Sequence, residues 1–352
     1  MSRGQRWFRH FSALLLGYLL FVIVFGAWVR ISGSGAGCGE HWPSCQGVLV
    51  PRAPSQATLI EYSHRLTSGL LGLAALALPV WAFACFSPGH AARRWSVWTL
   101  ALVAVEGGIG AGLVKNRLVA DDASLARAVV VALHLVNTLL LTASAALTLM
   151  AAREAGPGAP RTGLRPQTPA QRFQTPAQRL QTPAQRVQTP GQRPLTAAHP
   201  QTFAQRMQVA AQHPQLSWLS VGVLIGLGLV AASGAVTALG DTLFPAGTIA
   251  SEGSQHFLLQ LRVVHPILAC ALIVATLGWA RLLASLPETR PWALALGALA
   301  LLQLLLGALN VLWRAPGWLQ LGHLLLAQLL WLSAVLAARG AHSPGFGPVM
   351  RP

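Results

Sequence analysis

Eight long apolar segments constrain this chain more than any other feature of its sequence. Each contains roughly 18 or more predominantly apolar residues, the length that an α-helix needs to cross the hydrocarbon core of a bilayer. The segments are residues 11–29, 66–86, 96–114, 128–150, 216–239, 263–283, 292–313 and 318–338. Because a segment in lipid must satisfy its own backbone hydrogen bonds, each is expected to be a helix. The sequence therefore predicts an all-α membrane protein with eight transmembrane helices.

Composition agrees with this fold class, since 53% of the residues are hydrophobic and only 10% are charged, against about 25% charged residues in soluble domains. The first segment is not expected to be a removable signal peptide, because its apolar run is too long and Gly26-Ala-Trp-Val-Arg30 is no small-residue cleavage site. The net charge of +16 is interpreted as a topology signal plus a basic loop. No nucleic-acid recognition motif accompanies it, so the lipid bilayer is the expected partner and nucleic acid is not.

The basic residues predict the orientation of the helices. When the eight helices are threaded alternately, nine arginines fall on the side of the N-terminus, and eight more lie in the loop after the fourth helix. The opposite side holds eight basic residues and five acidic ones. Long loops weigh less in the positive-inside rule, so the even number of helices and the basic N-terminus decide the prediction. We expect a multi-pass protein of the cell membrane with both termini in the cytoplasm.

Four histidines lie in or next to even-numbered apolar segments, one in each. They are His64, His134, His265 and His323. In the predicted orientation all four lie near the extracytoplasmic face, where an ionisable residue in a membrane helix is a functional candidate by default. A neutral imidazole nitrogen ligates haem iron, and two facing helices supply two axial ligands. The four histidines therefore predict haem binding in preference to four unrelated core histidines.

The second half of the chain repeats the first. Aligning the two helix histidines of each half matches helices one to four with helices five to eight, and it matches Glu106 with Gln303. This predicts two tandem four-helix bundles related by pseudo-two-fold symmetry, each with a histidine pair on facing helices and room for a planar cofactor. The predicted domains are an N-terminal bundle at residues 1–151, a linker at residues 152–215 and a C-terminal bundle at residues 216–352.

The predicted linker has a different composition from both halves. The hexapeptide Gln-Thr-Pro-Ala-Gln-Arg recurs in it with a period of seven residues, from Gln167 onward. Proline in every repeat prevents a continuous helix, and too few apolar side chains are present to offset the entropy of the chain. We expect a disordered cytoplasmic linker. The sequence leaves two interpretations of the repeat: an expansion that the protein tolerates without a function, or a segment whose arginines contact anionic lipid headgroups.

Only the first half has an acidic residue close to its first histidine. Glu61 precedes His64 by three residues and so shares its helical face, whereas Arg262 takes this place before His265. The spacing leaves two interpretations of Glu61: an acid or base beside the iron, or an interfacial carboxylate paired with Arg65 or another arginine. Arg65 and Arg262 lie at the outer rim, where guanidinium groups suit haem propionates.

Two cysteines, Cys38 and Cys45, lie in the first outer loop. The compartment outside a bacterial membrane is oxidising, and a separation of seven residues allows a disulfide loop. His41 lies between the cysteines, but zinc needs more ligands than these. Both a purely stabilising disulfide and a redox-active pair near the haem remain open from the sequence.

Several motifs of the chain resemble the haem A synthases, membrane enzymes that convert haem O to haem A for terminal oxidases. The motifs are the four helix histidines, Gly26-Ala-Trp-Val-Arg-Ile-Ser-Gly-Ser-Gly-Ala-Gly-Cys38, Trp42-Pro-Ser-Cys45 and Ile60-Glu-Tyr-Ser-His-Arg-Leu66. The resemblance covers both halves but not the linker, and its most specific motifs lie in the first half. The chain departs from the family in its long linker and in having no cysteine pair in the second half.

The resemblance implies a site in each half. His265 and His323 would ligate a low-spin haem b, whereas His64 and His134 would hold the substrate haem with Glu61 important for turnover. The implied reaction is oxidation of the C8 methyl group of haem O to a formyl group. It implies haem O synthase and a quinol or another electron-transfer partner as partners, and it is compatible with a homo-oligomer.

Two other functions are compatible with the histidines. A quinone-linked b-type cytochrome that only transfers electrons would explain the four histidines, but not the occurrence of Glu61 and the cysteines in one half only. In a transporter with parallel repeats, the histidines would form a proton relay. Haem absorbance of the purified protein separates the transporter from the other two, and formation of haem A separates the synthase from the cytochrome.

Overall fold

The structure, a computed structural model, describes residues 2–154, 214–244, 256–286 and 289–341. These residues form eight helices and no strand. The helices are α1 (Arg3–Ile31), α2 (Gln56–Cys85), α3 (Ala91–Lys115), α4 (Leu125–Glu154), α6 (Pro214–Leu243), α7 (Phe257–Ala284), α8 (Arg290–Leu312) and α9 (Gly317–Ala341). Each is long and apolar enough to cross a membrane. The prediction of an all-α membrane protein with eight such helices is confirmed.

The helices extend beyond the apolar segments that predicted them. The largest extension is at the start of α2, which begins at Gln56, ten residues before the apolar segment at residues 66–86. Ser55 caps this end, because its side chain accepts a hydrogen bond of 3.1 Å from the backbone N–H of Thr58. A cap of this kind satisfies one of the free N–H groups of the first turn. The extension places Glu61 and His64 on the helix itself.

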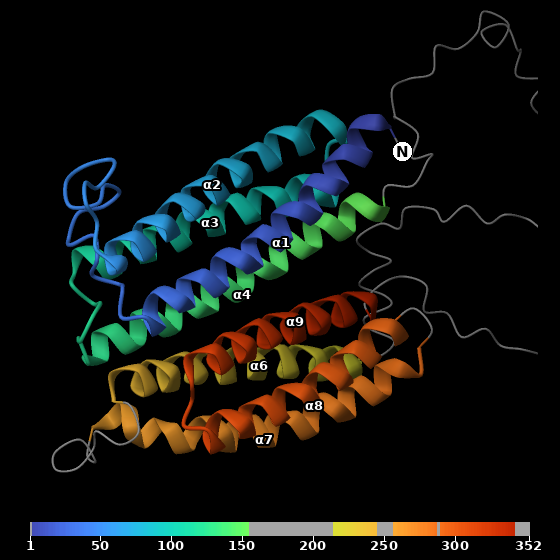
Figure 1. The fold of residues 1–352 in the computed structure, drawn as a ribbon. Helices are drawn as coiled ribbons and strands as arrows, with labels where there is room; N and C mark the ends of the chain where they lie inside the picture. Colours follow the sequence, from blue (N-terminus) through green and yellow to red (C-terminus); the bar gives the residue numbers. More distant parts are fainter. Residues whose placement is uncertain (1, 155–213, 245–255, 287–288, 342–352) are drawn as a thin grey trace, which may run out of the picture.

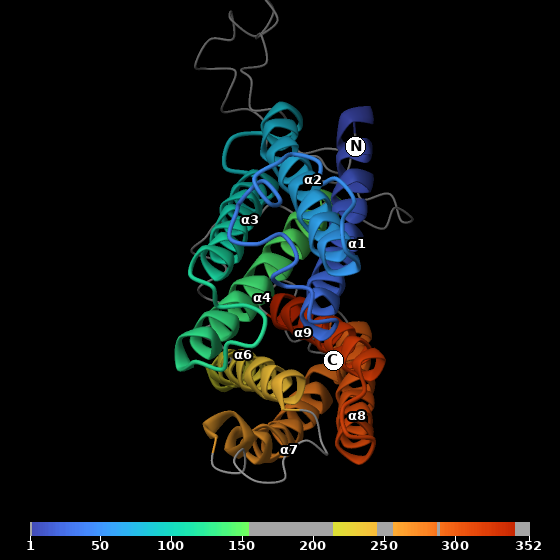
Figure 2. The same ribbon diagram turned by 60° about the vertical axis from the view of Figure 1, so that its left-hand side comes forward.

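The helices form two groups of four (Figure 1). In the first group each of α1 to α4 contacts the next and α1 contacts α4, so the ring is closed; α6 to α9 form a second closed ring in the same order. The two groups meet where α1 and α4 lie against α6 and α9, which is visible in the turned view of Figure 2. The order of neighbours is thus the same in both halves, whereas a pseudo-two-fold relation between them stays a prediction.

Polar contacts cross the boundary between the two groups. The indole N–H of Trp331 donates to the carbonyl oxygen of Leu139 at 2.8 Å, and the hydroxyl of Thr142 donates to the side-chain oxygen of Gln328 at 3.1 Å. All four residues are buried. Since buried donors and acceptors are costly when unpaired, these bonds favour a single arrangement of the two groups.

The predicted linker at residues 152–215 lies almost wholly outside the described residues. At its edges α4 continues to Glu154 and α6 begins at Pro214. The regular helices therefore reach slightly into the range that composition assigned to the linker.

The helices that carry the four histidines all begin at the same end of the molecule (Figure 1). The histidines follow the first residues of α2, α4, α7 and α9 by eight, nine, eight and six residues, respectively. At a rise of 1.5 Å per residue, the spread of three residues corresponds to roughly 4.5 Å along the helix axis. The histidines therefore lie at a similar distance from the starts of their helices, whereas a common level in the membrane stays a prediction.

The tightly packed cores lie toward the other end of each group. In α3 the buried residues Ala92, Ser96 and Thr99 form one stripe, after which no residue is buried until Val114. In α8 the equivalent stripe ends at Ala300. The histidine-bearing ends of the two groups are therefore less densely packed than the opposite ends.

Candidate functional site

His64 lies against a glycine of the neighbouring helix. A Cβ atom on Gly26 would come within 3.1 Å of Cε1 of His64, which is closer than side chains normally approach, so the absent side chain makes room for the imidazole. The ring packs edge-on to Phe25 with 5.5 Å between the centroids. Its Nδ1 atom is buried and makes no hydrogen bond within the described part of the chain.

His265 has the same kind of neighbour in the second group. A Cβ atom on Gly234 would lie 2.8 Å from Cε1 of His265. The Nδ1 atom of His265 lies 3.1 Å from the carbonyl oxygen of Val230 and 3.1 Å from the hydroxyl oxygen of Ser233. Because the carbonyl oxygen only accepts, it favours the tautomer with the proton on Nδ1, and Nε2 is left free to ligate a metal.

The second histidine of each group contacts a polar side chain of the preceding helix. The Nδ1 atom of His134 lies 3.5 Å from a carboxylate oxygen of Glu106, and the Nε2 atom of His323 lies 3.2 Å from the amide nitrogen of Gln303. Glu106 and Gln303, which the repeat aligns, thus each contact the second histidine of their own half.

The histidines lie near one another in pairs. His134 is among the groups whose charge acts on His64, and His265 is among those whose charge acts on His323. The two histidines of each half therefore lie within electrostatic range of each other, and their service as two axial ligands of one haem stays a prediction.

Glu61 is buried, with 3% of its surface exposed, and both of its carboxylate oxygens accept hydrogen bonds. One accepts from the backbone N–H of Cys38 at 2.8 Å; the other accepts from the guanidinium of Arg65, with Nε at 3.1 Å. The ion pair with Arg65, one of the two interpretations from the sequence, is therefore present. The hydrogen bond from Cys38 joins the start of α2 to the loop between α1 and α2, the predicted first outer loop.

The first outer loop contains the predicted disulfide between Cys38 and Cys45. The guanidinium of Arg65 donates to the carbonyl oxygens of His41 and Ser44, the latter at 2.6 Å. Glu61 and Arg65 thus hold both branches of the disulfide loop against α2. The disulfide is confirmed, whereas its redox activity stays a prediction.

Arg262 of α7 forms an ion pair with Asp241 of α6, with 2.6 Å between Nε and Oδ1. It also donates to the carbonyl oxygen of Phe244 at 2.6 Å. The second half therefore has an acidic group at the same end as its histidines, although none precedes His265 on its own helix. Contact of Arg65 and Arg262 with propionates stays a prediction, since both guanidinium groups already bind protein oxygens.

Sequence reasoning did not single out two acidic residues near the histidines, Glu106 and Asp241. Both reach their partners from a different helix, and spacing along one helix cannot reveal such a contact. A signal was available for Glu106, because a carboxylate in the middle of an apolar segment is itself a functional candidate.

The residues present fit haem. The Nδ1 atoms of His64, His134 and His323 are buried without a hydrogen bond. Nε2 of His323 lies 3.2 Å from the amide nitrogen of Gln303, so a ligand on Nε2 would displace that contact. No group of three or more histidine, cysteine or acidic residues suited to a metal ion occurs in the described ranges. Haem needs only two protein ligands, because the porphyrin supplies the other four.

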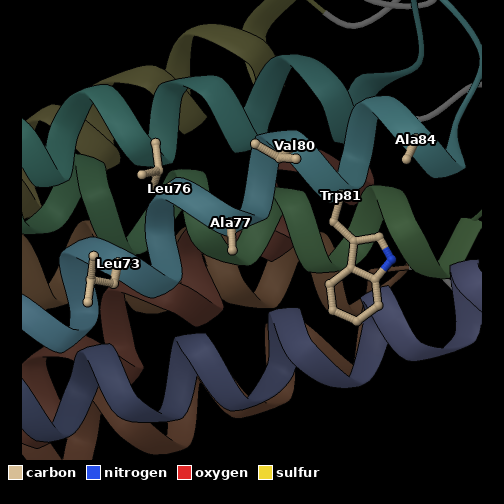
Figure 3. A pocket seen from close by; sticks show the side chains of 6 residues that line it. All are labelled: Leu73, Leu76, Ala77, Val80, Trp81 and Ala84. Atoms are coloured by element: carbon tan, nitrogen blue, oxygen red, sulfur yellow. The ribbon is translucent and has the colours of Figure 1, made fainter.

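A shallow apolar hollow on α2 is separate from these residues. It is lined by Leu73, Leu76, Ala77, Val80, Trp81 and Ala84 (Figure 3). Trp81 points toward α1, where its ring contacts Phe8 and Phe11. With Leu73 and Val80 each more than 60% exposed, the hollow belongs to the outer surface of a membrane helix and carries no candidate site residue.

Comparison with known proteins identifies relatives of the chain. Residues 9–178 match the COX15-CtaA family, described as "Cytochrome oxidase assembly protein". A protein of Thermus thermophilus named "Protoheme IX farnesyltransferase" is 39% identical over 340 residues, which are 93% of this chain and 47% of that protein. The chain thus spans about half the length of this relative.

Shorter matches occur with proteins named "Heme A synthase". The protein of Geobacillus kaustophilus is 38% identical over 114 residues, which cover 32% of this chain and 35% of that protein. The protein of Alkalihalophilus pseudofirmus is 41% identical over 96 residues, which cover 27% of this chain and 32% of that protein. These matches agree with the haem A synthase family that the sequence motifs resemble, and residues 9–178, just under half of the chain, are similar to the COX15-CtaA family.

Proposed function

We propose that this chain is a haem A synthase, which oxidises the C8 methyl group of haem O to the formyl group of haem A. The observation that carries the proposal is the presence of a histidine pair in each half, with the disulfide loop bonded to Glu61 and Arg65 beside the first pair, whereas the second half has no cysteine pair. An electron-transferring cytochrome would need the histidines but not this difference between the halves.

The substrate site is proposed in the N-terminal bundle, residues 1–151. His64 and His134 would hold haem O from facing helices, and Gly26 provides the space for the ring of His64. The oxidation would proceed by two hydroxylations of the methyl carbon and loss of water from the resulting geminal diol, and an external oxidant would take up the four electrons of the net change. Glu61 lies one helical turn before His64 and would accept or donate protons during these steps.

The cofactor site is proposed in the C-terminal bundle, residues 216–352, where His265 and His323 would ligate haem b. A bound haem b supplies one-electron redox chemistry and would connect the substrate site with a quinol or another electron donor or acceptor. The hydrogen bond from Nδ1 of His265 to the carbonyl oxygen of Val230 holds the ring with Nε2 available. We further propose that both termini and the linker at residues 152–215 lie in the cytoplasm.

A haem O synthase is the proposed partner that supplies the substrate. The Thermus thermophilus relative is named for transfer of a farnesyl group to protohaem IX, and more than half of its length lies outside the match. Farnesylated haem is the substrate that haem A formation needs. The name of this relative therefore supports a partner that makes haem O close to the site that consumes it.

Co-expression tests the proposed function. Cells that lack their own haem A synthase should form haem A when they express this chain together with a haem O synthase, and should accumulate haem O when the chain carries His64→Ala. Haem extracted from the membranes is separated by chromatography and identified by its absorption spectrum. A protein that binds haem b but never yields haem A would be a cytochrome, and one without any haem absorbance would be neither.

A further inference from the structure

Glu106 is a carboxylate held in place beside one of the candidate haem ligands. It comes from the middle of α3, and two side chains of α4 donate to it: the amide of Asn137 to Oε2 and the hydroxyl of Thr138 to Oε1. Both donors are buried. Oε1 also faces His134, whose Nδ1 atom lies 3.5 Å away.

The charge of Glu106 is not balanced by a basic side chain in the described part of the molecule, where its one ion-pair contact is His134. The other acidic residues with an ion-pair contact there face arginines. A carboxylate among apolar helices is costly, and such groups mark functional sites by default. The contact with His134 therefore calls for an explanation beyond packing.

Gln303 occupies the corresponding place in the other half. Glu106 follows the buried Thr99 by seven residues, and Gln303 follows the buried Leu296 by seven, so each continues the inward stripe of its helix by two turns. The amide nitrogen of Gln303 lies 3.2 Å from Nε2 of His323. The chain thus places a carboxylate beside Nδ1 of the second histidine in the first half, and an uncharged amide beside Nε2 of the second histidine in the other half.

We propose that Glu106 is a positioning residue, which accepts a hydrogen bond from Nδ1–H of His134 and so directs Nε2 to the iron of the bound haem. A carboxylate in this role also makes the imidazole a stronger electron donor, whereas an amide does not. The first half would therefore hold its haem with a more basic ligand than the second half. This inference rests on the proposed function, because it assumes that His134 ligates the substrate haem.

The consequence is a difference in reduction potential between the two haems. A more basic axial ligand stabilises ferric iron, so Glu106 lowers the potential of the first-half haem. Glu106→Gln preserves the size of the side chain and an oxygen that accepts from Thr138, and it removes the charge. It should raise that potential and weaken haem binding in the first half by about 10-fold to 100-fold.

The test is a redox titration of the purified full-length protein, loaded with haem b and haem O by co-expression with a haem O synthase. His134→Ala identifies the first-half haem, because that component should disappear from the titration. Glu106→Gln should then raise the potential of this component alone. Gln303→Glu is a control in the other half, where the side chain lies beside Nε2 of His323, and it should leave the potential of the first-half component unchanged.

An unchanged first-half potential in Glu106→Gln at normal haem content would overturn the inference, and so would an equal shift of both haems. If Glu106→Gln does not fold, Glu106→Asp decides, since it keeps the charge but withdraws the carboxylate from Nδ1 of His134 by one methylene, and an unchanged first-half potential then contradicts the inference. Retention of both haems in His134→Ala would refute the proposed ligand and the inference together. Loss of one haem in His134→Ala, without any shift in Glu106→Gln, would refute only the inference.

Discussion

The Nδ1 atom of His265 lies 3.1 Å from the carbonyl oxygen of Val230, one helix away. The bond fixes the ring and leaves Nε2 free, so in the proposed site His265 would be oriented for iron before haem binds. We predict that His265→Ala and His323→Ala lose the low-spin haem b spectrum, whereas His64→Ala keeps it. Absorption spectra of the purified variants check this division. Equal loss of the spectrum in all of these variants would contradict it.

Gly234 is expected to be essential for haem b binding. Alanine at this position would bring Cβ within 2.8 Å of Cε1 of His265, so the imidazole must move. We predict that Gly234→Ala lowers haem b per protein several-fold without loss of expression. Gly228→Ala is the matched control on the same helix, because its Cβ would meet nothing within 4 Å. Similar haem contents in the two variants would show that the close approach has no effect on binding.

Variants of Glu61 and Arg65 distinguish a catalytic role of Glu61 from a purely structural one. If Glu61 handles protons, Glu61→Gln should lower haem A formed per bound haem by about 10²-fold to 10⁴-fold. Arg65→Met should instead lower stability and haem occupancy, because it removes the bonds to the first outer loop and leaves a buried carboxylate unpaired.

The double variant Glu61→Gln/Arg65→Met completes a double-mutant cycle, since the effects of two mutations in one ion pair on the free energy of unfolding are not additive. If the ion pair is the whole role of Glu61, both single variants and the double variant will lose stability to a similar extent. Their turnover per bound haem will then stay normal. Normal turnover in Glu61→Gln would thus remove the proposed catalytic role.

Arg30 connects the two helix groups at the histidine-bearing end. Its guanidinium on α1 donates to the carbonyl oxygen of Ala238 and the hydroxyl of Thr242 on α6, and to the side-chain oxygen of Gln320 on α9 at 3.1 Å. Arg30→Met leaves these acceptors without their donor, which should cost about 1–3 kcal/mol of stability. Thermal unfolding in detergent measures the effect. The exposed Arg52, replaced in the same way, should change the unfolding temperature little; an equal change in both variants would argue against a bridging role.

Membrane topology and packing were predictable from the sequence to different degrees. The apolar segments revealed all eight helices because their length and composition suffice for a membrane span. The helix ends were not predictable in this way. The first turns of α2, from Gln56 to Glu61, contain polar residues and so lie outside the apolar segment, although the cap at Ser55 makes them helical.

The candidate site was predictable only in part for a related reason. His64 and Glu61 share a helix, so spacing placed them together, and the Arg65 alternative could be stated in advance. Contacts between helices, such as Glu106 with His134 and Asp241 with Arg262, depend on which faces meet after packing. Nothing in the spacing of a single helix encodes that choice.

The repeat linker remains a prediction from sequence, because it lies outside the described residues. Deletion of about residues 165–205 should leave membrane insertion and haem A formation intact, since the closure entropy of a flexible loop changes slowly with length. The deletion keeps a connection between α4 and α6. Membrane fractionation and haem extraction check this, and loss of haem A at normal expression would assign the repeat a function.

The similar distance of the four histidines from the starts of their helices has a consequence for energy coupling if haems bind to them as proposed. The histidines differ by at most three residues in their distance from the helix starts, or roughly 4.5 Å in a hydrocarbon core about 30 Å thick. An electron that passes between haems at these positions moves parallel to the membrane surface. It crosses only a small part of the transmembrane voltage, roughly 0.3 kcal/mol per 100 mV. Exchange of electrons between the two halves should therefore proceed equally well in energised and de-energised membranes.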